Sequence, residues 1–344
     1  MATALPVDEF LAEARRFPLV DVRSPGEYLH GHIPGAINIP LFTDEERARV
    51  GTLYKQKGAQ EALLAGLEIV GPKMPGFVRE ACLIAREGRL LVHCWRGGMR
   101  SGSFAWLMET AGLQVTTLRS GYKAYRRQVL SAYDLPLQLR IVGGETGSGK
   151  TEILQHIARA GEQVLDLEAI AHHRGSAFGA LGQEPQPSVE QFENNLYDAF
   201  SRLDQSRPIW LEDESRSIGR VYVPNPLWAQ MEQAPVYRIR IPQEVRLKRL
   251  VRDYGSFPKE ELEAAILRIS KRLGDLSTRQ ALEALHEGRL EETARISLAY
   301  YDKAYNFPHA KRNYAGVRFV DGEGDDAALN AQLILSCVNS TAEA

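Results

Sequence analysis

The stretch LQLRIVGGETGSGKTEILQHIAR, residues 137–159, predicts a strand, a loop and a helix in that order. Residues 137–142 read as the strand and residues 150–159 as the helix. Between them lies the phosphate-loop pattern G-x-x-x-x-G-K-[ST], whose glycines let backbone N–H groups wrap around an anion at a helix N-terminus. The pattern consists of Gly144, Glu145, Thr146, Gly147, Ser148, Gly149, Lys150 and Thr151.

Two side chains of this loop carry its predicted chemistry. Lys150 would neutralise outer phosphate oxygens, and the hydroxyl of Thr151 is placed to bind a Mg²⁺ ion. The alternative is a glycine-rich turn without a ligand, which the complete pattern between a strand and a helix disfavours. These residues predict a phosphate or diphosphate ligand, and none of them specifies adenine.

Further strands are predicted after the loop, at residues 163–167, 208–211, 236–241 and 317–320. The second of these leads into Glu212 and Asp213, whose carboxylates could contact Mg²⁺ through water, because ligands bind at such strand ends. The alternative is a solvated acidic turn. Residues 244–306 have a helical, charged pattern. We therefore expect a P-loop NTPase-like α/β domain with a helical C-terminal part.

The first part of the chain also alternates strands and helices. Strands are predicted at residues 18–22, 89–93 and 115–118, and helices at residues 78–86 and 103–109. This alternation predicts an α/β domain with a mostly parallel sheet. Residues 134–136 read Asp-Leu-Pro, and proline ends helices. The predicted domains are therefore residues 1–133 and 137–344.

A cysteine follows the predicted strand at residues 89–93. Cys94 opens the loop Cys-Trp-Arg-Gly-Gly-Met-Arg-Ser, where backbone N–H groups and a helix N-terminus favour a thiolate. Arg96 and Arg100 add positive charge, so the loop could also hold an anionic persulfide or its selenium analogue. The spacing from Cys94 to Arg100 also resembles that of cysteine phosphatases, and a buried structural cysteine is a third interpretation. Cys82 and Cys337 lie in helical segments and are expected in the core.

Composition and charge limit the classes of ligand and the compartments that are expected for the protein. The net charge is −2, so any nucleic-acid contact must use a local basic patch. Three scattered cysteines form no disulfide framework, which favours a reducing cytoplasm. The N-terminal stretch does not read as a signal peptide, and no apolar run is long enough to cross a membrane. The histidine spacing predicts no structural metal.

Two more groups of residues are candidates for substrate contact, with a surface loop and a solvated helix face as the alternatives. A loop after the strand at residues 163–167 could grip phosphate through its arginine and serine and supply an acid or base through its histidines. Its candidates are His172, His173, Arg174 and Ser176. A basic segment could face nucleic-acid phosphates, and tyrosines beyond it could stack bases or pack in the core. These are Arg238, Arg240, Arg246, Lys248, Arg249 and Arg252, with Tyr300, Tyr301 and Tyr305.

The N-terminal motifs at residues 21–28 (DVRSPGEY) and 31–40 (GHIPGAINIP) resemble the rhodanese signature, which favours a sulfurtransferase loop over a phosphatase loop at Cys94. The resemblance implies structural roles for Asp21, Arg23 and Glu27. A rhodanese-like domain followed by a P-loop domain resembles the tRNA 2-selenouridine synthase family. The segments at residues 94–101, 167–179 and 212–219 strengthen this match, which covers residues 7–320.

The resemblance implies a tRNA-modifying transferase that acts on 2-thiouridine at the wobble position. The sulfur would be alkylated by geranyl diphosphate, and selenium from selenophosphate would then displace the S-geranyl group. Cys94 would carry the chalcogen. The resemblance implies that the protein has no tightly bound cofactor beyond a Mg²⁺ ion. It also implies that the anticodon arm of tRNA is a partner and that the protein contacts the selenophosphate-producing enzyme. The alternatives are a P-loop ATPase or kinase with a rhodanese domain, and a non-catalytic adaptor.

Overall fold

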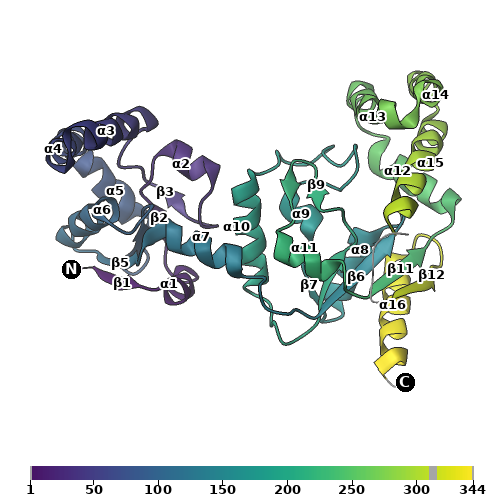
Figure 1. Cartoon of the computed structure of the whole chain (residues 1–344), viewed down its shortest axis with the longest axis horizontal. Coiled ribbons are helices and arrows are strands. Elements are labelled where there is room, and N and C mark those ends of the chain that lie inside the picture. The colour runs from purple at the N-terminus through teal and green to yellow at the C-terminus, as the bar shows by residue number, and fades with distance from the viewer. Residues whose placement is uncertain (1, 310–315, 343–344) are drawn as a thin grey trace. The chain divides into compact units, whose positions relative to one another are not determined.

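The computed structural model describes residues 2–309 and 316–342, and the chain divides into two compact units (Figure 1). The first unit holds the residues before Tyr133 together with Glu193–Tyr197, and the second holds Tyr133–Phe192 and the residues from Asp198 onward. Each unit is built around a five-stranded parallel sheet, which confirms the predicted α/β class. Among the described residues, no helix is both long and apolar enough to span a bilayer.

The sheet of the first unit has the strand order β1-β5-β4-β2-β3, and every neighbouring pair is parallel. The three predicted strands are confirmed as the second, fourth and fifth strands in chain order. The other two, at Thr3–Leu5 and Ile37–Asn38, were missed because they are short and mostly exposed, so neither forms the apolar run that marks the buried strand at Leu19–Asp21. The strands are β1 (Thr3–Leu5), β2 (Leu19–Asp21), β3 (Ile37–Asn38), β4 (Arg89–His93) and β5 (Gln114–Leu118).

Helices cover both faces of this sheet, so its central strand is buried on both sides and reads as an apolar run. Leu90 and Val92 of β4 face one core, while Leu91 faces the other with Tyr122. The helices are α1 (Val7–Ala14), α2 (Pro25–His30), α3 (Asp44–Lys57), α4 (Ala59–Val70), α5 (Met74–Ile84), α6 (Met99–Thr110) and α7 (Gly121–Ser131), with a short 3₁₀ turn at Gly71–Lys73.

The sheet of the second unit has the order β12-β11-β6-β8-β7, again all parallel. Its central strand, β6, is the first of the five in sequence. The chain then adds β7 and β8 on one side of β6 before it adds β11 and β12 on the other side. This reversal opens a crevice at the carboxyl end of the central strand, where ligands bind in such sheets. The strands are β6 (Leu139–Gly144), β7 (Gln163–Val164), β8 (Ile209–Glu212), β11 (Val236–Arg240) and β12 (Val317–Asp321).

The predicted helical part of the second unit is a group of four helices, α12 to α15, with a small core of its own around Leu262, Ile266 and Leu285 (Figure 1). A two-stranded antiparallel hairpin of β9 (Ser217–Ile218) and β10 (Val221–Tyr222) was not predicted. The helices are α8 (Lys150–Arg159), α9 (Leu167–Ala171), α10 (Val189–Phe200), α11 (Asn225–Met231), α12 (Gln243–Tyr254), α13 (Lys259–Leu273), α14 (Asp275–His286), α15 (Leu290–His309) and α16 (Ala327–Ala342).

One predicted strand was too long. Residues 163–167 were expected to be a strand, yet β7 ends at Val164 and Leu167 begins helix α9. The cause is Asp166, whose carboxylate accepts a hydrogen bond 2.8 Å from the backbone N–H of Ala169 and so caps the helix.

Candidate active sites at the thiol loop and the phosphate loop

The thiol loop, residues 94–98, joins β4 to α6. Cys94 is 3% exposed, and its Sγ lies 3.2 Å from the hydroxyl of Ser101 in the first turn of α6. The thiol therefore lies at the N-terminal, positive end of a twelve-residue helix, as the sequence predicted.

Two glycines hold this loop against the turn between β5 and α7. Gly97 and Gly121 both have positive φ, at 64° and 61°. A Cβ atom on Gly97 would lie 2.6 Å from the carbonyl oxygen of Leu118, and one on Gly121 would lie 2.4 Å from that of Cys94. The backbone N–H of Tyr122 donates to the same Cys94 carbonyl at 2.8 Å. Side chains at the two glycines would therefore force the loops apart.

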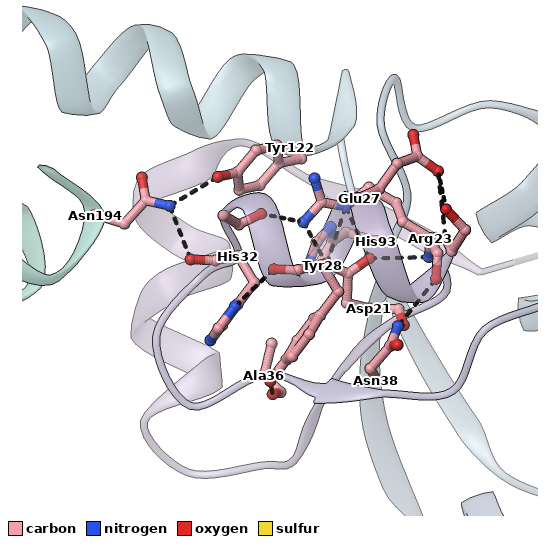
Figure 2. Close-up of polar contacts among 12 residues, drawn as sticks. Asp21, Arg23, Glu27, Tyr28, His32, Ala36, Asn38, His93, Tyr122 and Asn194 are labelled. Carbon is pink, nitrogen blue, oxygen red and sulfur yellow. Dashed lines mark hydrogen bonds and ion pairs between the residues drawn. The ribbon is translucent and has the colours of Figure 1, made fainter. Parts of the chain in front are cut away.

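A buried polar network lies beneath the thiol loop (Figure 2). The guanidinium of Arg23 donates to both carboxylate oxygens of Asp21 at 2.6–3.0 Å and lies 3.8 Å from the centre of the Tyr122 ring. Burial opposes ionisation of Asp21, but His93 and Arg23 hold its pKa below the usual value. The structural role predicted for the Asp21–Arg23 pair agrees with this arrangement.

His93 completes this network directly before Cys94. Its Nε2 lies 3.6 Å from Oδ2 of Asp21, and its ring stacks with Tyr122 at a centroid distance of 6.0 Å. Burial lowers the pKa of His93 to about 4, so its ring is neutral at pH 7. On the far side of Tyr122, the amide of Asn194 donates to the tyrosine hydroxyl at 2.7 Å (Figure 2).

The two arginines predicted beside the thiol differ in their surroundings. Arg96 is exposed to solvent. Arg100 donates to Glu27 at 2.7 Å. Burial opposes ionisation of Glu27, but the hydrogen bond and the charge of Arg100 hold its pKa below the usual value. The charge of Arg100 is therefore largely offset by Glu27, which also caps α2 through Ser24, so the loop has less net positive charge than its sequence suggests.

The phosphate loop follows β6 as predicted. Nζ of Lys150 donates to the carbonyl oxygen of Gly144 at 3.0 Å, which closes the loop on itself. Gly147 and Gly149 adopt φ values of 80° and 78°, and α8 begins at Lys150. The loop therefore has the form that a bound phosphate requires, a ring of backbone at the N-terminus of a ten-residue helix.

Glu145 of the loop is not directed at a ligand. Its carboxylate lies 3.0 Å from the guanidinium of Arg246 and 3.7 Å from that of Arg238. Arg246 also donates to the carbonyl oxygen of Thr146 and to both oxygens of Asp302. The side chain of Glu145 therefore anchors the phosphate loop to α12.

Carboxylates gather beside Thr151 and Lys150. The Thr151 hydroxyl donates to Oε2 of Glu168 at 2.9 Å, and Oε1 of Glu212 accepts from the backbone N–H of Glu168 at 2.7 Å. Burial and then the charges of Asp166 and Glu168 raise the pKa of Glu212 well above its usual value. Burial and Glu168 also raise that of Glu214. A cation near Thr151 would offset this repulsion.

The loop at residues 172–176 comes beside this cluster. His173 is buried, and burial lowers its pKa. The ring of His172 instead contacts the carbonyl oxygen of Pro185, with 3.2 Å between Nδ1 and the oxygen. Arg174 is exposed, and its guanidinium lies 5.8 Å from the centre of the Tyr254 ring.

A cleft of about 1230 Å³ joins these groups. It is lined by the loop from Thr146 to Thr151 and by His173, Arg174, Ser176 and Asp213, whereas His172 and Glu212 are not among the described residues that line it. Sequence reasoning missed three basic residues that α13 contributes to the cleft. Their spacing of three and four residues places them on one face of the helix and is the signal that was available. They are Arg268, Lys271 and Arg272.

The basic segment at residues 238–252 is not the open patch that was proposed for tRNA. Arg246 and Arg249 are buried, at 4% and 5% exposure. Arg249 is ion-paired with Glu152 and Asp325, and Arg252 also pairs with Asp325. Glu152 and Asp325 lie far from this segment in the sequence, so the segment itself did not reveal them. Lys248 and Arg252 are the basic residues of α12 that remain exposed.

Other predictions had mixed outcomes. Cys82 was expected in the core, yet it is exposed, because α5 turns Phe77 and Ala81 inward and the next residue outward. Cys337 packs partly buried against the core of the second unit, as expected.

The tyrosines that were candidates for stacking bases lie in α15. The hydroxyl of Tyr301 accepts from the N–H of Ala177 at 2.9 Å, and Arg272 contacts Tyr300. The side chain of Tyr305 lies outside the described residues.

Comparisons with known proteins follow the same division. The profile of the tRNA 2-selenouridine synthase AAA domain matches residues 137–328, and that of the rhodanese-like domain matches residues 6–128. One similar solved structure, the N-terminal domain of an ATP/GTP binding protein from Clostridium difficile 630, is 38% identical and covers 37% of this chain and 99% of its own, with a TM-score of 0.34. A rhodanese-related protein from Thermoplasma volcanium is 17% identical and covers 37% of this chain and 92% of its own, with a TM-score of 0.24.

Curated relatives named tRNA 2-selenouridine synthase cover most of the chain. The protein from Nitrosomonas europaea is 39% identical over 69% of this chain and 63% of its own length, so the match spans less than two thirds of that relative. The protein from Aeromonas salmonicida is 36% identical over 80% of both chains. The protein from Shewanella denitrificans is 33% identical over 96% of this chain and 97% of its own. On this evidence, the chain belongs to the tRNA 2-selenouridine synthase family.

Proposed function

We propose that the protein converts 2-thiouridine at the wobble position of tRNA to 2-selenouridine through an S-geranyl intermediate, with geranyl diphosphate and selenophosphate as substrates. Family membership supports the overall reaction. The observation that carries the proposal is that one chain contains both a thiol at a helix N-terminus, Cys94, and a phosphate loop that opens into a large cleft.

The first step belongs to the phosphate loop. The sulfur of 2-thiouridine attacks the allylic carbon of geranyl diphosphate, a C–S bond forms, the C–O bond to diphosphate breaks, and the uridine N3 proton is lost to water. Diphosphate leaves as an anion, so its departure is helped by groups that stabilise negative charge more strongly in the transition state. Lys150 and the N–H groups of residues 144–151 are those groups.

A Mg²⁺ ion fits this site as a companion of the diphosphate. In such sites the ion is held by one or two protein oxygens, with phosphate oxygens and water supplying the rest. The hydroxyl of Thr151 and the carboxylates of Glu168 and Asp213 line the cleft and would hold the ion, which would neutralise diphosphate charge.

The second step belongs to the thiol loop. The S-geranyl group turns the sulfur into a good leaving group, so a selenium nucleophile can add to C2 of the uracil and expel geranylthiolate. We propose that Cys94 takes the selenium derived from selenophosphate. The Se–P bond breaks and phosphate leaves to water, while a disulfide oxidant takes up the two electrons that are released as the S–Se bond forms. When the selenium has bonded to C2, a thiol breaks the S–Se bond and returns these two electrons. The N-terminus of α6 and the hydroxyl of Ser101 suit a negatively charged chalcogen at this position.

The proposed partners follow from these substrates. The anticodon arm of tRNA must reach the cleft with its wobble base, and Arg268, Lys271 and Arg272 supply positive charge at the cleft wall. The selenophosphate-producing enzyme is the partner proposed for the rhodanese-like unit, because its product is the second substrate.

The test uses the full-length protein and a thiolated anticodon stem-loop RNA. Geranyl diphosphate alone should give the S-geranyl nucleoside, and later addition of selenophosphate should give 2-selenouridine, both read by mass spectrometry of digested RNA. Hydrolysis of ATP together with no consumption of geranyl diphosphate would favour the P-loop ATPase or kinase instead.

A further inference from the structure

A second, narrower cavity adjoins the phosphate-loop cleft. Its volume is about 70 Å³, and it lies between α12, α14 and α15 in the helical part of the second unit. Some of its lining residues also line the cleft, so the two spaces are continuous. The shared residues are Thr146, Ser176, Leu250, Tyr254 and Tyr301.

The interior of this cavity is apolar. Leu262, Leu285 and Leu298 form much of its wall. Three residues of α15 add hydroxyls to the lining, and each hydroxyl already has a partner. Thr293 donates to the carbonyl oxygen of Arg289 at 3.1 Å, and Ser297 donates to that of Thr293 at 2.9 Å. The hydroxyl of Tyr301, at the mouth, accepts from the N–H of Ala177 at 2.9 Å. The protons of Thr293 and Ser297 are therefore engaged, and these two side chains have no free donor for an occupant.

The phosphate loop touches the helix that forms the cavity mouth. A Cβ atom on Gly147 would lie 3.2 Å from Cγ of Leu250, which lines both spaces. Thr146, the preceding loop residue, lines both spaces as well. A carbon chain attached to a diphosphate in the loop therefore meets the cavity within a short distance of the phosphate.

We propose that this cavity is the subsite for the apolar chain of an allylic diphosphate. The inference rests on the proposed function and adds to it the place where the chain binds. An isoprenoid suits the cavity because it has only carbon and hydrogen to bury. At about 70 Å³ the cavity takes part of the chain, and the rest lies in the adjoining cleft. A purine ring would leave its ring nitrogens without partners there, at a cost in affinity.

The small side chain of Ala294 gives access to this subsite. Ala294 is half-buried in α15 and lines the cavity. A phenylalanine at this position would occupy the space that the chain needs. Ala299 lies on the same helix, is exposed and lines neither cavity, so Ala299→Phe is a matched control.

The experiment is calorimetric titration of the full-length protein with inorganic diphosphate and with geranyl diphosphate, each with Mg²⁺. Wild type should bind geranyl diphosphate at least about a hundredfold more tightly than inorganic diphosphate, because the chain buries apolar surface. Ala294→Phe should lose most of this gain and keep its affinity for inorganic diphosphate. Ala299→Phe should match wild type for both ligands.

The possible outcomes test the subsite separately from the proposed reaction. Equal affinity of wild type for the two ligands, or an undiminished gain in Ala294→Phe, would overturn the subsite. A protein that shows the expected affinities but transfers no geranyl group to thiolated RNA would refute the proposed function and leave the subsite supported. If Ala294→Phe also loses inorganic diphosphate, the smaller Ala294→Leu is judged by the same criteria.

Discussion

The thiol of Cys94 lies 3.2 Å from the hydroxyl of Ser101, one turn into the helix that follows the thiol loop. A chalcogen bound to Cys94 would be close to this hydroxyl and to the helix N-terminus. The thiol is also nearly buried, so a partner must reach it through the exposed face of the loop at residues 96–98.

Cys94→Ala should abolish selenium incorporation and leave S-geranylation of 2-thiouridine near the wild-type rate, because the phosphate loop is untouched. Mass spectrometry of tRNA nucleosides measures both products. Cys82→Ala, which removes an exposed thiol from the same unit, should behave as wild type. Wild-type amounts of 2-selenouridine from Cys94→Ala would exclude this residue as the carrier.

Lys150→Ala should lose geranylation of 2-thiouridine, and with it selenation of the plain substrate, because the departing diphosphate loses its full positive charge. The loss should be about a hundredfold or more in kcat/KM, as for other single transition-state contacts. RNA that already carries the S-geranyl group should restore much of the selenation. The prediction fails if the geranylated RNA is no better a substrate for this variant than the plain one.

Arg246→Ala should destabilise the protein by about 2 kcal/mol, because the half-buried Asp302 would lose this ion pair and Glu145 would keep only Arg238. Its affinity for inorganic diphosphate should also fall, since the phosphate loop loses an anchor. Urea unfolding and calorimetry measure the two effects. Lys248→Ala removes an exposed charge from the same helix and should change stability by less than about 0.5 kcal/mol. Equal stabilities for the two variants would show that the Arg246 ion pairs contribute little.

Binding of tRNA should depend on the basic face of α13. Lys271→Ala/Arg272→Ala should weaken binding and lower the slope of log affinity against log salt concentration by up to about two units. The matched control is Lys259→Ala/Arg279→Ala, which removes the same charge from exposed positions outside the cleft. Identical slopes for the two double variants would place the tRNA contact elsewhere.

Stability should fall in mild acid because of His93. Its pKa of about 4 in the folded state lies below the usual value of 6.5, so the unfolded chain binds the proton more readily. The contribution of neutral His93 to the free energy of unfolding is complete above pH 6.5. It is lost as the pH falls towards 4, by about 3 kcal/mol in total. His93→Phe should flatten the dependence of urea unfolding on pH between 7 and 4.5, whereas His30→Phe, at an exposed position, should not.

Local signals in the sequence were enough to locate both loops. The strand before Cys94 and the strand and helix around Lys150 lie next to the residues that they position, so spacing alone identified them. The structural roles of Asp21 and Arg23 were instead implied by the rhodanese resemblance, and in the structure the two side chains are bonded to each other.

Contacts between distant parts of the chain were beyond that reasoning. Arg246 reaches Asp302 across 56 positions, and Arg249 reaches Glu152 across 97, so nothing near either arginine reveals its partner. Cys82 was misplaced for a smaller reason, because one residue of a helix is a rotation of about 100° and separates the buried face from the exposed one. The apolar cavity beside the phosphate loop is built from helices that the sequence showed only as charged and helical.

The close approach of Gly97 and Gly121 has a consequence for Cys94 while the protein is being synthesised. During synthesis Cys94 leaves the ribosome before residue 121, and the turn that its loop rests on does not yet exist. In that interval the thiol is an ordinary cysteine on an unfolded segment, open to oxidants and to other thiols. The protected setting of Cys94 is therefore acquired only when the second turn has left the ribosome, so oxidation of the thiol competes with folding during that interval.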